Sequence, residues 1–276
     1  MPQKTRRGKR PLPFVFSVTG TKVLHRFLSN PLLLRVVSFG AVLAAWEYAG
    51  RAGVSAAFPS FSETLAAWIG LAADGSLLKA LSITIFPLVI GIVISGTTGI
   101  AIGLLMGLSR RAEWLGVPLF IVLQAAPLAA IIPMLILAYG VGIATKVAVV
   151  CVMAIPVIVL NSYKAIRHTP GSLLEMGHSF LATRGQMITK VMLPSASPII
   201  FAGLRLGVAA GFIGAILAEL LISPTGIGDL ITYNQSIAEY PRMYAAIVTV
   251  IIMSVLFLEL LGKIEISLFR PEKRIA

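Results

Sequence analysis

Long apolar runs separated by short polar segments make up most of the chain. An α-helix needs roughly 20 residues to cross about 30 Å of hydrocarbon, and six of the runs are near or above that length. They lie at residues 32–50, 81–108, 114–139, 144–160, 198–222 and 243–264. The pattern predicts an all-α, polytopic membrane protein with one transmembrane domain over residues 31–265. A basic arm (1–30) precedes this domain and a short tail (266–276) follows it.

Composition excludes a soluble globular protein. Hydrophobic residues make up 57% of the chain and charged residues 12%, with a mean hydropathy of +0.93. An average soluble domain has about 25% charged residues. The chain is therefore expected in a lipid bilayer.

The net charge of +12 follows the predicted topology. Most of the lysines and arginines fall in the arm, the tail and every second connecting segment, which is typical of cytoplasmic segments. The exceptions are Arg51, Lys79, Lys146 and Arg242 in outer segments and Arg205 within a span. We therefore expect both termini on the cytoplasmic side of the membrane. Because no basic patch carries interleaved aromatic residues, the expected partner of the excess charge is anionic lipid and no nucleic acid.

The residues that usually carry catalysis are sparse. Cys151 is the only cysteine, and the three histidines are scattered along the chain. No phosphate-binding G-x-x-x-x-G-K-[ST] loop, nucleophile elbow or H-E-x-x-H motif occurs. We predict no metal site, no nucleotide bound by this chain and no enzymatic activity of its own.

Two spans carry glycines four residues apart. This spacing places small residues on one helix face, where a neighbouring helix can approach closely. We predict helix packing at Gly99, Gly103, Gly107, Gly203, Gly207 and Gly211.

The third predicted span contains two prolines six residues apart, Pro127 and Pro133. Each removes a helix hydrogen bond, so the sequence predicts a bent helix whose freed carbonyls face protein or water rather than lipid. Gln124, Pro127 and Pro133 are therefore candidates for lining a pathway. Glu219 in the fifth span is a further candidate, although a structural role or a subunit contact fits it equally well.

A polar loop over residues 164–197 separates the fourth and fifth spans. Apolar residues recur at helical spacing after Ser172, and Glu175 stands three residues beyond it. This arrangement predicts a capping box that opens a short amphipathic helix. A short helix with an exposed apolar face needs a partner.

Glu175, followed at the end of the basic loop by Leu193-Pro194, resembles the EAA loop of binding-protein-dependent ABC transporter permeases. Gly177 stands where that pattern has an Ala, and Leu181 stands where it has a turn-forming Gly. The P-S-x-x-E-T-L run that begins at Pro59 is similar to the branch that transports nitrate, sulfonate and taurine. The resemblance implies a type I importer fold with six transmembrane helices and a cytoplasmic coupling helix. It implies ATPase-coupling roles for Leu174, Glu175, Gly177, His178, Leu181, Leu193 and Pro194.

The same resemblance implies a location in a bacterial inner membrane and the partners of this chain. A second permease copy, expected to form a homodimer, would complete the pathway. A separate ABC ATPase would bind ATP and Mg, and a periplasmic or lipid-anchored solute-binding protein would deliver a small anion. A thiamine-precursor-like or aromatic ligand remains open. The alternatives are an ATP-independent secondary transporter or channel and a structural membrane anchor.

Overall fold

The computed structural model describes residues 31–222 and 225–269, and all regular elements there are helices. In chain order they are α2 (Pro31–Arg51), α3 (Phe61–Ala73), α4 (Ser76–Leu108), α5 (Arg110–Ala125), the 3-10 helix η1 (Leu128–Ile131), α6 (Ile132–Tyr139), α7 (Ile143–Arg167), α8 (Gly171–Ser179), α9 (Arg184–Gln186), the π-helix η2 (Met187–Met192), α10 (Leu193–Ile222), α11 (Ile227–Ser236) and α12 (Tyr240–Phe269). The predicted all-α class is confirmed. The expectations for residues 1–30 and 270–276 lie outside the described residues.

Five helical segments in the described chain are long and apolar enough to cross a membrane. They are α2 from Leu32, α4, α7, the continuous segment Arg184–Ile222 that ends with α10, and α12 over Tyr240–Ser267. The remaining predicted span, residues 114–139, is divided between α5 and α6. Several spanning helices also extend beyond the predicted runs at one or both ends, because their terminal turns contain polar residues that a hydropathy pattern does not include.

The division of the third span follows from Pro127. The residue before a proline is pushed towards extended conformations, and Ala126 has φ −65° and ψ 145°. A single 3-10 turn, η1, then leads into α6. The sequence predicted a bend here, whereas the structure has a full interruption of the helix.

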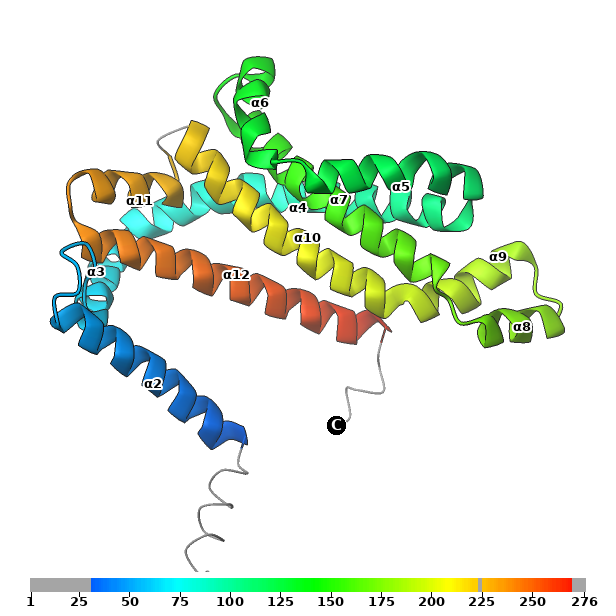
Figure 1. The fold of residues 1–276 in the computed structure, drawn as a ribbon, viewed down its shortest axis with the longest axis horizontal. Coiled ribbons are helices and arrows are strands. Elements are labelled where there is room, and N and C mark those ends of the chain that lie inside the picture. The colour runs from blue at the N-terminus through cyan, green and yellow to red at the C-terminus, as the bar shows by residue number, and fades with distance from the viewer. Residues whose placement is uncertain (1–30, 223–224, 270–276) are drawn as a thin grey trace, which may run out of the picture.

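Helix α7 lies in the middle of the bundle and packs along both α4 and α10 (Figure 1). Both glycine faces pack against it. A Cβ added at Gly103 would lie 2.5 Å from the Ser162 Cβ, and one added at Gly207 would lie 2.2 Å from the Ile158 Cγ1. The absence of side chains therefore allows both helices to approach α7 more closely than any larger residue would permit.

The short helices gather at the two ends of the elongated bundle. Helices α3 and α11 lie at one end, and α8 and α9 lie at the opposite end (Figure 1). Ser60 and Glu63 form a reciprocal capping box that begins α3. The Asp74 carboxylate accepts hydrogen bonds from the Ser76 hydroxyl and backbone N–H, which lowers the pKa of Asp74. This interaction helps to set the turn between α3 and α4.

Candidate functional site

Helix α8 does not begin with the predicted capping box. It begins at Gly171 after Pro170, and no side chain caps its first turn. Pro170, with φ −55° and ψ 131°, occupies the capping position, and its carbonyl accepts hydrogen bonds from the N–H groups of Leu173 and Leu174. Because the proline ends the preceding turn, Ser172 lies inside the helix, and that prediction is wrong.

Large apolar side chains project from α8 and the turn that follows it. Met176 is 45% exposed, Phe180 80% and Leu181 90%. Met176 and Phe180 are four residues apart and share one face, while Glu175 and His178 are exposed beside them. Sequence reasoning left Met176 and Phe180 out of the coupling residues, although their helical spacing was a usable signal.

Leu181 adopts a conformation that normally favours glycine. Its φ is +53°, in the left-handed region. The turn is closed by the Leu181 N–H donating to the His178 carbonyl at 2.9 Å and the Ala182 N–H donating to the Gly177 carbonyl at 3.0 Å. The bend expected of a glycine is therefore made by a leucine, at a cost of about 1–2 kcal/mol. The same bend leaves the Leu181 side chain exposed.

The other predicted coupling residues support the loop from within. Gly177 is buried, and a Cβ added there would lie 2.6 Å from the Met187 Cε. Leu193, half-buried, packs against the cluster formed by Ala165, Ile166, Ala196 and Ile200. Leu174 is half-buried, and Pro194 is exposed in the first turn of α10. Gly177 therefore allows α8 to pack closely on η2, whereas Leu193 contributes to the packing of α10 on α7.

A second site, which is polar and buried, lies at the opposite end of the bundle, between α4, α7, α10 and the start of α11. The Lys146 Nζ donates to the Glu219 Oε1 at 3.0 Å and to the Thr225 hydroxyl at 3.0 Å. The two charged side chains are 5% and 1% exposed. Lys146 was expected in an outer segment, but the structure buries it as the partner that Glu219 requires.

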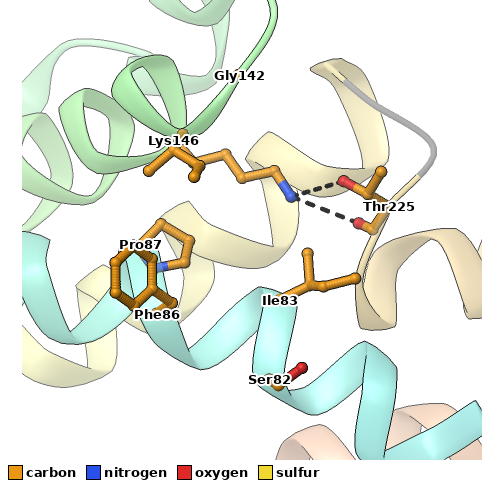
Figure 2. Close-up of a pocket in the computed structure, with 8 residues that line it drawn as sticks. Ser82, Ile83, Phe86, Pro87, Gly142, Lys146 and Thr225 are labelled. Carbon is orange, nitrogen blue, oxygen red and sulfur yellow. Dashed lines mark hydrogen bonds between the residues drawn. The ribbon is translucent and has the colours of Figure 1, made fainter.

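Beside this pair lies a pocket of about 420 Å³. Figure 2 shows Lys146 and Thr225 meeting across it, with the side chains of α4 below them. Its lining residues are Ser82, Ile83, Phe86, Pro87, Gly142, Ile143, Lys146 and Thr225. Glu219 does not line the pocket, because it is enclosed behind Lys146.

The remaining pathway candidates are all exposed. Gln124, Pro127 and Pro133 are all exposed, along α5, η1 and α6. No residue of α5 is buried. Arg205, the basic residue within a predicted span, forms an ion pair with Glu265 of α12. No group of three His, Cys, Asp or Glu residues that could hold a metal ion occurs among the described residues.

The arrangement is that of a transmembrane subunit with a short helix, α8, whose apolar side chains are exposed at one end. In fold it is similar to a solved structure of the MetNI methionine ABC transporter in an inward-facing conformation, with a TM-score of 0.54 and 19% sequence identity over 66% of this chain and 93% of that chain. The likeness shows a type I ABC importer fold.

Comparison of sequences then identifies the family. The model described as "Binding-protein-dependent transport system inner membrane component" matches residues 99–265, and the chain belongs to this family. It is 28% identical to the putative aliphatic sulfonates transport permease protein SsuC of Bacillus subtilis, over 75% of this chain and 76% of that protein. It is 32% identical to the riboflavin transport system permease protein RibX of Chloroflexus aurantiacus, over 56% of this chain and 58% of that protein. The chain is thus an inner-membrane ABC importer permease, which decides against an ATP-independent transporter or channel.

Proposed function

We propose that this permease carries a small anion, such as a sulfonate, taurine or nitrate, and couples to a separate ATPase through α8. The observation that carries the coupling proposal is the exposed apolar face of Met176, Phe180 and Leu181 at one end of the bundle. A cluster of exposed apolar side chains of this kind is typical of a protein–protein interaction site. A chain without a nucleotide-binding motif also needs a contact through which free energy reaches it.

A second copy of the chain is the proposed partner of the α5–α6 surface. Non-helical backbone at membrane depth is tolerated only where protein covers it or where it lines a water-filled cavity. The interruption at Ala126 and Pro127 lies on a surface where α5 buries no residue. Two copies facing each other there would shield the free carbonyls and enclose a pathway.

The proposed substrate class has weaker support than the coupling. The P-S-x-x-E-T-L run and the sulfonate-permease relative favour a small anion. The riboflavin-permease relative favours an aromatic ligand instead. We give the anion priority because the sulfonate relative matches more of the chain, and a solute-binding protein would make the final selection.

Co-purification with the separate ABC ATPase tests the coupling proposal. We expect the wild type to retain the ATPase, and Glu175→Lys to weaken the complex by roughly 10-fold or more, since a reversed charge at a docked surface is repelled. Leu181→Gly should weaken it while leaving thermal stability equal or higher, because the backbone strain is relieved. Glu239→Lys, an exposed charge reversal at the opposite end, is the matched control.

ATP hydrolysis by the same complexes tests the substrate class. Solute-binding protein loaded with taurine, nitrate or riboflavin is added in turn, and we expect stimulation with an anion. Stimulation by riboflavin alone would overturn the anion assignment. Equal ATPase binding by the wild type and both α8 variants would overturn the coupling role of this helix.

A further inference from the structure

The first turn of α11 has no cap of its own. Gly226 occupies its capping position and offers no side-chain hydrogen bond. The first N–H groups of a helix have no partner within the helix and carry a partial positive charge. Burial of this turn therefore requires acceptors from another part of the chain.

Glu219 of α10 and Thr84 of α4 supply those acceptors. The Gly228 N–H donates to the Glu219 Oε2 at 3.0 Å, and the Ile227 N–H donates to the Thr84 Oγ1 at 3.0 Å. The Thr84 hydroxyl also lies 2.9 Å from each Glu219 carboxylate oxygen. A carboxylate at a helix N-terminus is favoured by the macrodipole, so Glu219 acts as a cap supplied by a different helix.

Lys146 completes the cluster from α7. Its ammonium group pairs with Glu219 and also donates to the Thr225 hydroxyl just before α11. The loop fits tightly over the carboxylate: a Cβ added at Gly226, where φ is +86°, would lie 2.2 Å from the Glu219 Oε1. A single buried pair thus connects four elements, α4, α7, α10 and α11.

We propose that Lys146 and Glu219 are positioning residues for transport. They hold α11 rigidly to the outer ends of α4, α7 and α10, so that this end moves as one body when the solute-binding protein docks. Thr225 accepts a hydrogen bond from Lys146. Together with Ile83 it lines two adjoining pockets. The transport role rests on the proposed function above, whereas the fixing of α11 does not.

Distance measurement in the permease alone tests the fixing. Spin labels are placed at Leu78→Cys in α4 and Tyr233→Cys in α11, which are 66% and 59% exposed, in a Cys151→Ala background. We expect a narrow distance distribution in lipid nanodiscs, and a broadened one in Glu219→Gln. Thr84→Val removes the hydroxyl without leaving a charge unpaired, and it should also broaden the distance distribution. If Glu219→Gln does not fold, the result with Thr84→Val decides whether α11 is fixed.

Thr97→Val is the matched control, because the Thr97 hydroxyl on α4 donates only within its own helix. It should leave the distribution narrow. Narrow distributions in both test variants would overturn the fixing of α11.

ATP hydrolysis in the reconstituted complex tests the transport role. Loss of coupling should lower the ratio of binding-protein-stimulated to basal hydrolysis by roughly 3- to 10-fold in Thr84→Val. An unchanged ratio with a broadened distribution would overturn the transport role. Absence of any stimulation in the wild type would instead refute the proposed function, and the distance result would stand separately.

Discussion

At the scale of single residues, glycines set how closely the central helices approach. Gly103 faces the Ser162 Cβ and the Val159 carbonyl oxygen, and the latter would lie 2.7 Å from an added Cβ. A backbone atom cannot rotate away as the end of a side chain can. Tolerance to substitution therefore depends on what each glycine faces, and not on glycine spacing alone.

Gly103→Ala should destabilise the protein by about 1–3 kcal/mol, because α4 must move away from α7. Gly40 in α2 has no atom within 4 Å of an added Cβ and is the matched control. Gly40→Ala should be neutral or stabilise by roughly 0.5–1 kcal/mol through helix propensity. Thermal unfolding in detergent, followed by circular dichroism, measures both, and equal effects would contradict the packing argument.

At the scale of elements, the interrupted segment α5–η1–α6 differs most from a simple spanning helix. It is held open by Pro127, and its carbonyls must face protein or water. Helix α2 is the contrasting case, since it is continuous and its most apolar window has no buried residue. Lipid can surround α2, because the backbone hydrogen bonds of a continuous helix are made within it. Lipid offers no hydrogen-bond partner to the free carbonyls at the interruption.

A thiol-labelling experiment separates these two environments. In a Cys151→Ala background, Gln124→Cys should react with a membrane-impermeant thiol reagent in native membranes, because the proposed pathway at the interruption would admit water. Phe39→Cys in α2 is 72% exposed but faces lipid, and it should react at least about 10-fold more slowly. Similar protection of both cysteines would argue against a water-filled pathway at Gln124.

At the scale of the whole molecule, the two ends differ in structure. One end presents the exposed apolar face of α8, and the other holds α11 with a buried ion pair. Long helices join them, so a contact at one end can be transmitted as a rigid-body movement. The distribution of lysine and arginine predicts the orientation of these ends in the membrane.

Reporter fusions test that orientation. Green fluorescent protein fused after Ala276 should fluoresce, because both termini are expected in the cytoplasm. Alkaline phosphatase fused after Asp74, between α3 and α4, should be active because that turn is expected outside. A dark fluorescent fusion together with an inactive phosphatase fusion would reverse the topology.

The sequence by itself determined the class of protein, the number of apolar runs and the position of the polar loop that contains α8. Each of these depends on local pattern: hydropathy over about 20 residues, glycine spacing, and a short motif beginning at Glu175. The proline interruption was also visible, since Pro127 acts on its immediate neighbour. The sequence did not show whether Pro127 bends the helix or divides it, because contacts with neighbouring helices decide between the two.

Only the tertiary structure decided which charges meet. Lys146 and Glu219 are 73 residues apart, and no local pattern pairs them. Hydropathy placed Lys146 in an outer segment because a lysine near a span end is usually solvated. The structure buries it, since a carboxylate enclosed by helices needs a countercharge and hydrogen-bond donors. The left-handed Leu181 was likewise decided by the turn that must be closed, against the preference of the residue itself.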